Sequence, residues 1–189
     1  MEATDGRWSS DGARPARSWQ PPTDNTPPYT HVPGPDHTMT TPRHRLIEQR
    51  REQLGLGVGE LARRIGVSLN EYYDVESYET ELTMVLPLKN ARSLAAVLGF
   101  ELGTLLGAGP PGGAQKTNSK PRHVILVEAR QRLGVSTSTM AEDIGFEEIF
   151  VHSIENNSEA LDTYPYEVLK IVSSYLKLDP NDLLYAPPA

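Results

Sequence analysis

The sequence contains no cysteine, so the chain forms no disulfide and offers no thiolate ligand to a metal ion. It also lacks any apolar run that approaches the roughly 20 residues of a membrane-spanning helix. The first ten residues are polar, include Glu2 and Asp5, and lack the apolar segment of a secretory signal. From these absences we expect a soluble, cytoplasmic protein that has no membrane partner.

Positive charge is scarce as well, because 18 lysines and arginines are outnumbered by 25 aspartates and glutamates, for a net charge of −7. Most of the deficit lies in residues 122–189, which carry 5 basic and 11 acidic side chains. Residues 43–107 are nearly balanced, with 8 basic and 9 acidic side chains. Proteins that bind nucleic acid usually carry a basic patch, so residues 122–189 have the wrong sign for that role.

The N-terminal residues 1–41 are predicted to be a disordered tail. Eight of the 16 prolines lie between Pro15 and Pro42, and such a segment buries too little apolar surface to offset its ordering entropy. Trp8 and Trp19 lie in this tail, and we interpret the tail as a spacer that carries isolated aromatics. A short partner-binding motif is one alternative, and a biological start at Met39 is another.

Glycine and proline also dominate residues 108–121, which predicts a linker between two folded units at 42–107 and 122–186. In the first unit we expect Thr41 to cap a helix that begins at Pro42. Five short helices follow from the apolar periodicity, at 43–54, 58–65, 69–77, 87–97 and 102–106, with a loop through Glu79, Glu81 and Thr83. Leu46, Ile47 and Leu54 are expected to face the core.

The stretch from Leu54 to Glu76 is typical of two helices joined by a tight turn. Gly66 ends the first helix, because glycine adopts the left-handed conformation at little cost. Ser68 and Glu71 have the spacing of a capping box at the start of the second helix. The inward positions are expected to be Leu61, Ile65, Tyr72 and Val75.

The second unit repeats the first at an offset of 79 residues, which indicates two tandem copies of one domain. Gly66 corresponds to Gly145, for example, and Glu76 corresponds to Glu155. Beyond the third helix the offset becomes 78, as expected for a loop that has gained or lost one residue. The helices of the second copy are predicted at 122–133, 137–144, 147–156, 164–176 and 180–184, the last capped by Asp179 and begun by Pro180.

Both copies resemble the lambda-repressor/Cro-like helix-turn-helix family. In the first copy the family's pattern runs from Arg51 to Leu56, from Leu61-Ala62 to Gly66-Val67-Ser68, and over Val75-Glu76. In the second copy the corresponding segments are Arg130 to Val135, Met140-Ala141 to Gly145-Phe146, and Ile154-Glu155. The resemblance implies an all-α fold of two five-helix domains. It also implies that the arginine of the first helix pairs with the glutamate that ends the third, as Arg51–Glu76 and Arg130–Glu155. These pairs would be structural bridges rather than catalytic groups.

In this family the third helix is the recognition helix, which enters the major groove of double-stranded DNA. The candidate DNA-binding residues of the first copy are Arg43, Arg63, Arg64, Ser68, Asn70 and Tyr73. Leu69, Glu71 and Asp74 occupy positions where donors are usual. In the second copy Glu147 and Glu148 lie at the start of the recognition helix, where they would repel phosphate. The first copy is therefore the better DNA-binding candidate and the second is degenerate.

Two functions remain open. The first is a transcription regulator, in which the copies act as an intramolecular pseudo-dimer or the chain forms a homodimer. The alternative is a protein–protein interaction module, similar to an antitoxin or immunity-type protein, that keeps the fold and binds a basic partner. Its contact residues would be Tyr72, Tyr73, Tyr78, Glu147, Glu148 and Phe150.

We expect no enzyme activity, no cofactor and no metal site. The histidines show no ligand spacing. The acidic residues around Glu142 lack the alternating ligands and turn glycine of a calcium loop, and the glycines at 55, 57 and 59 join two helices rather than follow a strand.

Overall fold

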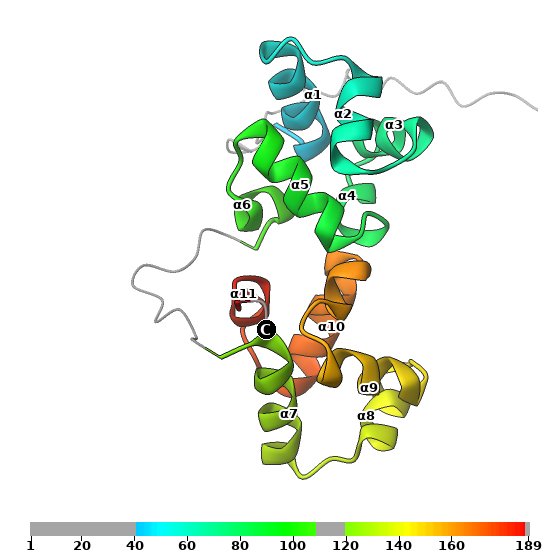
Figure 1. Ribbon diagram of the computed structural model, residues 1–189, viewed down its shortest axis with the longest axis vertical. Coiled ribbons are helices and arrows are strands. Elements are labelled where there is room, and N and C mark those ends of the chain that lie inside the picture. The colour runs from blue at the N-terminus through cyan, green and yellow to red at the C-terminus, as the bar shows by residue number, and fades with distance from the viewer. Residues whose placement is uncertain (1–40, 109–119, 188–189) are drawn as a thin grey trace, which may run out of the picture. The chain divides into compact units, whose positions relative to one another are not determined.

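The computed structural model describes residues 41–108 and 120–187, and within them the secondary structure is helical apart from an isolated bridge between Pro87 and Pro165. These residues form eleven α-helices and one short 3-10 helix, which confirms the all-α prediction (Figure 1). None of these helices is both long and apolar enough to cross a bilayer. The predicted tail, apart from Thr41, and most of the predicted linker lie outside the described residues.

Residues 41–108 contain six helices: α1 (Arg43–Gln53), α2 (Val58–Ile65), α3 (Leu69–Ser77), α4 (Glu81–Met84), α5 (Leu88–Leu98) and α6 (Leu102–Leu106). All but α4 lie within a residue of their predicted positions. The loop expected through Glu79, Glu81 and Thr83 is wrong in part, because α4 forms there. This helical turn buries Leu82 and Thr83, so burial of an apolar side chain outweighs the weak helical signal of a four-residue segment.

Residues 120–187 contain α7 (Arg122–Leu133), α8 (Thr137–Ile144), α9 (Glu148–Asn156), η1 (Ala160–Thr163), α10 (Tyr166–Leu176) and α11 (Pro180–Leu184). Two of them begin slightly later than predicted, because Glu147 and Pro165 precede α9 and α10 as extended N-caps. The 3-10 helix η1 was not predicted. It buries Leu161, which lies 79 residues after Leu82, so both segments place a short helical turn at the same point.

The helix ends follow from local chemistry at most positions. Gly66 has φ 77° and ends α2 in the left-handed conformation, as predicted. Ser68 and Glu71 form the predicted capping box, and the hydrogen bonds from Ser68 lower the pKa of Glu71. The side chain of Asp179 caps α11. The predicted Thr41 cap is wrong, because Pro42 occupies the N-cap position of α1 and no side chain bonds there.

The core is formed by apolar residues of nearly every helix. Leu61, Ile65, Tyr72 and Val75 are buried as predicted. Leu46 and Leu54 are not, since 38% and 42% of their surfaces are exposed. The buried face of α1 contains Ile47 and Arg51, which lie four residues apart and therefore on the same side of the helix. Leu46 is one residue before Ile47 and points to a different side.

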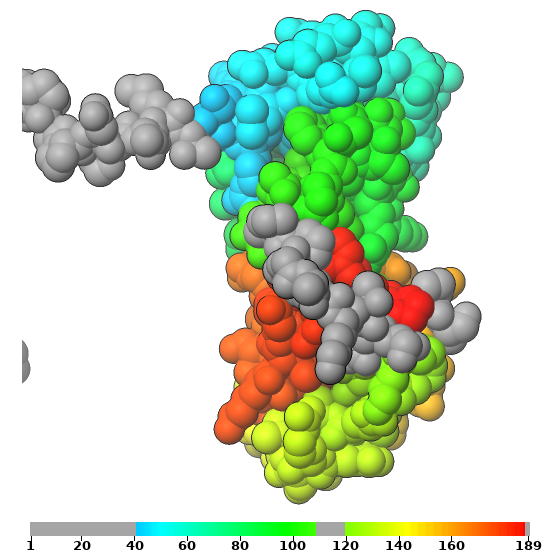
Figure 2. All heavy atoms as spheres, turned by 90° about the vertical axis from the view of Figure 1, so that its left-hand side faces the viewer, coloured from blue at the N-terminus to red at the C-terminus, as the bar shows by residue number. Residues whose placement is uncertain are grey.

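Hydrogen bonds join the two described segments, which belong to one compact unit. Leu88 N donates to Tyr164 O at 2.9 Å, and Arg92 Nη2 donates to Leu184 O at 2.5 Å. Gly103 N donates to the Tyr185 hydroxyl at 2.9 Å. Figure 2 shows the C-terminal residues, in red, against the green surface of α5 and α6.

Candidate nucleic-acid interface

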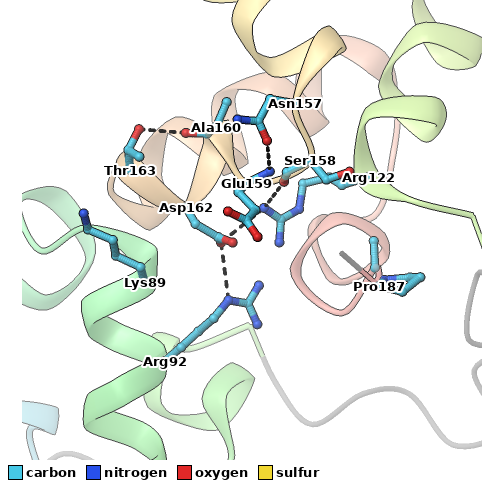
Figure 3. Close-up of a pocket in the computed structure, with 11 residues that line it drawn as sticks. Lys89, Arg92, Arg122, Asn157, Ser158, Glu159, Ala160, Asp162, Thr163 and Pro187 are labelled. Atoms are coloured by element: carbon cyan, nitrogen blue, oxygen red, sulfur yellow. Dashed lines mark hydrogen bonds and ion pairs between the residues drawn. The ribbon is translucent and has the colours of Figure 1, made fainter. Parts of the chain in front are cut away.

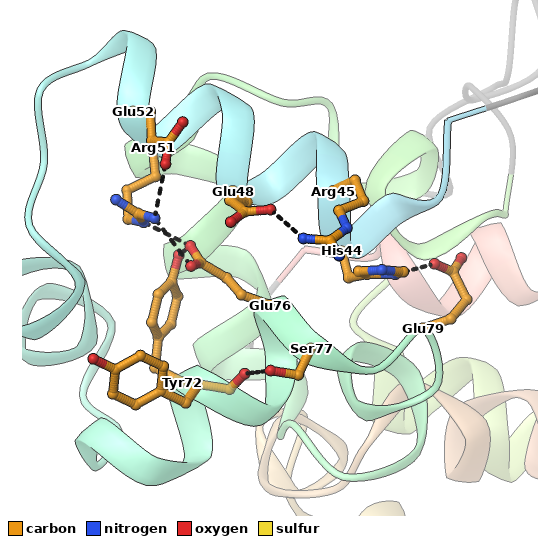
Figure 4. Close-up of polar contacts among 10 residues, drawn as sticks. His44, Arg45, Glu48, Arg51, Glu52, Tyr72, Glu76, Ser77 and Glu79 are labelled. Atoms are coloured by element: carbon orange, nitrogen blue, oxygen red, sulfur yellow. Dashed lines mark hydrogen bonds and ion pairs between the residues drawn. The ribbon is translucent and has the colours of Figure 1, made fainter.

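A bidentate ion pair connects α1 to the end of α3. Arg51 Nε donates to Glu76 Oε1 at 2.7 Å, and Arg51 Nη2 donates to Oε2 at 3.1 Å (Figure 4). Arg51 Nη1 also donates to Leu56 O at 3.1 Å, and the Tyr72 hydroxyl donates to Glu76 Oε1 at 2.5 Å. The bond to Glu76 raises the pKa of Arg51, and burial raises the pKa of Tyr72 far above its ordinary value.

The same pair recurs in the second segment. Arg130 Nε and Nη2 donate to the two carboxylate oxygens of Glu155 at 2.6 and 2.7 Å, and Arg130 Nη1 donates to Val135 O at 2.8 Å. Both pairs predicted from the resemblance are therefore present, with the same atoms and a carbonyl five residues beyond the arginine. Because each fork binds both carboxylate oxygens, it fixes the third helix in direction as well as in distance.

The exposed face of α3 carries three of the residues that the sequence predicts as DNA contacts, namely Ser68, Asn70 and Tyr73. Tyr73 is 50% exposed and Leu69 is 46% exposed, with Ser68, Asn70 and Asp74 exposed beside them. Ser68 accepts from Glu71 N, so its oxygen is partly committed to the cap. The donors available to base edges on this face are Asn70, Tyr73 and the Ser68 hydroxyl. No lysine or arginine lies on α3.

The two arginines of α2 are exposed and held only by local contacts. Arg63 Nε donates to Gly59 O at 3.2 Å. Because this acceptor is a neutral backbone carbonyl, the bond does not neutralise the charge of Arg63. Arg64 Nη2 forms an ion pair with Glu60 Oε1 at 2.5 Å, four residues earlier on the same helix. Exposed pairs of this kind contribute under about 1 kcal/mol, so this pair holds Arg64 only weakly.

Arg43, by contrast, is committed to the fold. Its Nε donates to Glu79 Oε1 at 2.8 Å and its Nη1 donates to Leu106 O at 2.9 Å, while His44 Nδ1 lies 2.9 Å from Glu79 Oε2. Burial alone would raise the pKa of Glu79, but the bonds from Arg43 and His44 lower it. We therefore remove Arg43 from the candidate DNA contacts.

The second segment has a similar arrangement, in which Arg122, His123 and Ser158 lie 79 residues after Arg43, His44 and Glu79. Arg122 donates to Leu183 O at 2.8 Å and to Ser158 O at 3.0 Å, and His123 Nδ1 lies 2.5 Å from Ser158 Oγ. This role of Arg122 and His123 was not predicted from the sequence. The sequence feature that could have indicated it is the Arg-His dipeptide, which occurs at 43–44 and again at 122–123.

A cavity of about 520 Å³ lies beside the contact between the two segments (Figure 3). Two arginines line it and share one carboxylate: Asp162 Oδ1 is 3.3 Å from Arg92 Nε and 3.1 Å from Arg122 Nη1. Burial lowers the pKa of Arg122, which is 4% exposed. Because these guanidinium groups also bind the carbonyls of α11, we assign them to holding the fold rather than to a ligand.

Two residues of the predicted protein-binding surface are not exposed. Tyr72 is 0% exposed and Phe150 is 5% exposed. Tyr72 points inward to meet Glu76, while Phe150 stacks on Phe146 with ring centroids 4.3 Å apart. Exposure of these two residues was wrongly predicted. Tyr73 and Tyr78 are exposed, as are Glu147 and Glu148.

Two further residues, Asn90 and Ile149, were not predicted from the sequence. Asn90 is buried, and its Nδ2 donates to Ile65 O at 2.7 Å and to Gly66 O at 3.3 Å, so it caps the C-terminus of α2. Ile149 is 69% exposed on α9. The sequence repeat could have predicted this exposure, because Ile149 corresponds to Asn70, which lies on the outward side of its helix.

The chain matches no known family model, no curated protein and no solved structure. Within the described residues no group of three or more histidine, aspartate or glutamate side chains has an arrangement that could hold a metal ion.

Proposed function

We propose that the chain is a helix-turn-helix DNA-binding protein of the transcription-regulator type. In this proposal α2 and α3 form the DNA-contacting pair, and α8 and α9 form a second, degenerate copy. The observation that carries it is the bidentate bridge, present as Arg51–Glu76 and Arg130–Glu155 with equivalent atoms. A three-residue turn that begins with a left-handed glycine precedes the third helix in both copies.

The geometry of α2 and α3 supports DNA contact by the first copy. A capped, bridged α3 presents Asn70 and Tyr73 on its exposed face, and the exposed arginines of α2 can meet phosphate. The second copy offers no such set, because Glu147 and Glu148 are exposed at the start of α9. Their charge opposes the approach of phosphate.

The number of available cations predicts weak binding by one chain. Arg63 and Arg64 are the exposed cations of α2, whereas specific complexes often neutralise about 6–10 phosphates. A homodimer on two half-sites would double the number of contacts, so we propose that the DNA-bound form contains two chains. The resemblance to the lambda-repressor/Cro-like family supports the same arrangement.

A second candidate function is a protein-interaction module, and it has its own supporting observation. The exposed surface of α3 and the residues after it carry large apolar side chains, namely Leu69, Tyr73, Tyr78, Met84 and Val85. Asp74 and Glu71 lie among them and no cation does. Such a surface favours a basic protein partner over DNA.

A salt titration of DNA binding separates these functions. We expect the full chain to bind double-stranded DNA with an affinity that falls with salt, and Arg63→Ala and Arg64→Ala each to lower the slope of log K against log[salt] by about 2, because a complex of two chains loses one phosphate contact from each chain. Fluorescence anisotropy of a labelled duplex measures both quantities. The control is Arg132→Ala, which removes an exposed cation of the second copy. Slopes that are equal in all four proteins would contradict DNA contact through α2.

A further inference from the structure

We propose that the N-terminal half of α9 is a docking surface for a basic peptide segment of another protein, which seats one apolar side chain beside Ile149. This goes beyond the DNA-binding proposal and does not depend on it. The surface consists of Phe146, Glu147, Glu148, Ile149, Phe150, Ser153 and Tyr164.

The hollow next to α9 is apolar and firmly built. It has a volume of about 350 Å³ and is lined mainly by the side chains of Phe146, Ile149, Phe150 and Tyr164. The Phe146 and Phe150 rings stack at 4.3 Å, and Phe150 meets Tyr164 edge-on at 5.0 Å. Phe150 is nearly buried, so these rings form a fixed floor on which an incoming side chain can pack.

Ile149 forms an exposed wall of this hollow. It is 69% exposed, the largest exposed fraction among the large apolar side chains of the described residues. A single exposed apolar side chain is ordinary, but one that adjoins an aromatic hollow extends a continuous apolar patch. Covering Ile149 and filling the hollow would remove both from water, which is the main driving force for association.

The charge around the patch selects a basic occupant. Glu147 lines the hollow and Glu148 lies beside it in the chain, and both are exposed. Most cations of the second segment are already paired, since Arg122 and Arg130 bind Asp162 and Glu155, and Lys170 binds Glu167. Glu148 accepts from the Thr137 hydroxyl at 2.7 Å and lies 3.5 Å from His152 Nε2, but no lysine or arginine pairs with Glu147 or Glu148 within the described residues, so both attract a positively charged peptide.

The same charges exclude two other occupants. DNA would bring phosphate against Glu147 and Glu148, and the same face of a second copy would bring four carboxylates together. Both arrangements are repulsive. A segment that carries lysine or arginine on either side of an apolar residue can fill the hollow with the apolar side chain and pair its cations with the carboxylates at the edge.

The first copy lacks this surface. Its equivalents of Ile149 and Phe150 are Asn70 and Glu71. Glu71 is exposed, and its side chain accepts the hydrogen bond of the capping box. α9 has no side-chain cap, and the corresponding position holds an aromatic ring instead. The docking surface is therefore built by the residues in which the second copy departs from the first.

The test uses the full chain without DNA, so its result is independent of DNA binding. A displayed library of random 12-residue peptides is selected on the protein, and an enriched peptide is then synthesised with a fluorescent label. We expect peptides that place Arg or Lys next to Trp, Phe, Leu or Ile. Ile149→Asp should weaken binding of the labelled peptide at least about tenfold, and Glu147→Gln about threefold, with a smaller dependence on salt.

Two controls keep the outcome specific. Ile171→Asp adds the same charge at an exposed isoleucine of α10 and should leave binding unchanged. Ile149→Ala, which carries no new charge, should still weaken binding, while circular dichroism verifies that each variant is folded. Failure to enrich basic and apolar peptides would overturn the proposal, as would equal binding by the wild type and Ile149→Asp.

Discussion

Among single residues, Glu76 makes the most consequential contacts of the candidate interface. Its carboxylate receives hydrogen bonds from Arg51 and from Tyr72, and its side chain is 9% exposed. A carboxylate in such a position holds two helices together through charge-assisted bonds, and its removal leaves a nearly buried guanidinium without its partner. The direction of α3, and hence of its exposed donors, depends on this residue.

Glu76→Gln should therefore lower the free energy of unfolding by about 1–3 kcal/mol, because the amide keeps the shape but loses the charge and one acceptor. Urea denaturation followed by circular dichroism measures the change. Glu52→Gln is the matched control, since Glu52 lies 3.8 Å from Arg51 but is 63% exposed. A similarly small effect from both substitutions would show that the bridge contributes little.

The contacts of single residues were predictable only where a pattern specified the partner. The Arg51–Glu76 pairing followed from the family resemblance and is present. The bond from Asn90 to the end of α2 was not predictable, because nothing local joins a residue of α5 to a carbonyl 25 residues earlier. The commitment of Arg43 to Glu79 and Leu106 was hidden for the same reason.

At the scale of elements, the turn between α2 and α3 sets the angle at which the two helices meet. Gly66 adopts φ 77°, and a Cβ placed there would lie 3.6 Å from Asn90 Nδ2, an ordinary contact. The cost of a side chain at this position is therefore backbone strain rather than a clash. The capping box then starts α3 two residues later.

Gly66→Ala should destabilise the protein by about 1–2 kcal/mol through the left-handed backbone alone. Gly57→Ala is the control, because Gly57 has φ −73° and no atom other than those of its chain neighbours lies within 4 Å of the point that its Cβ would occupy. The substitution causes no left-handed strain, so its effect should be smaller than that of Gly66→Ala. Thermal unfolding of the two variants gives the comparison. Equal melting temperatures would show that the turn tolerates a side chain and that glycine is not required.

Helix positions were largely predictable, and the misses have a common cause. Amphipathic segments with glycine or serine at an end predicted α2, α3, α5 and α8 almost to the residue. The short elements α4 and η1 were missed because one buried leucine, Leu82 or Leu161, decides each of them. A four-residue segment has no periodicity from which burial can be inferred.

At the scale of the whole molecule, the contact between the described segments includes a titrating group. The Tyr185 hydroxyl donates to Glu101 and accepts from Gly103 N. Burial, together with the bond to Glu101, raises the pKa of Tyr185 to about 12, above its ordinary value of 10.0. The folded state thus binds the proton more tightly than the unfolded state does.

Stability should therefore fall as the pH rises from about 10 to 12, because the contribution of this group is complete below the unfolded pKa and is lost as the folded pKa is passed. Tyr185→Phe should make that part of the profile less steep, while Tyr72, Tyr166 and Tyr175, whose pKa values are also raised, contribute alike in both proteins. Denaturant unfolding at several alkaline pH values compares them. Parallel profiles for the wild type and Tyr185→Phe would contradict the assignment.

The function was the least predictable property, because the scaffold and the exposed face give different indications. The bridges and the turn support a helix-turn-helix protein, whereas exposure and ion pairing leave few cations for DNA. Sequence alone identified Arg63, Asn70 and Tyr73 as candidates but could not show that Arg43 is engaged elsewhere.

A random-site selection with the full chain at about 50 mM salt tests the central claim most directly, because low salt favours any contact with phosphate. Bound duplexes are recovered, sequenced and compared with those bound by Asn70→Ala, which removes a proposed base-contacting donor of α3 without altering charge. We predict a recurrent site with two half-sites for the wild type and a relaxed preference at one position of each half-site for the variant. Recovery of no duplex above background, or of sequences without any shared site, would contradict the account.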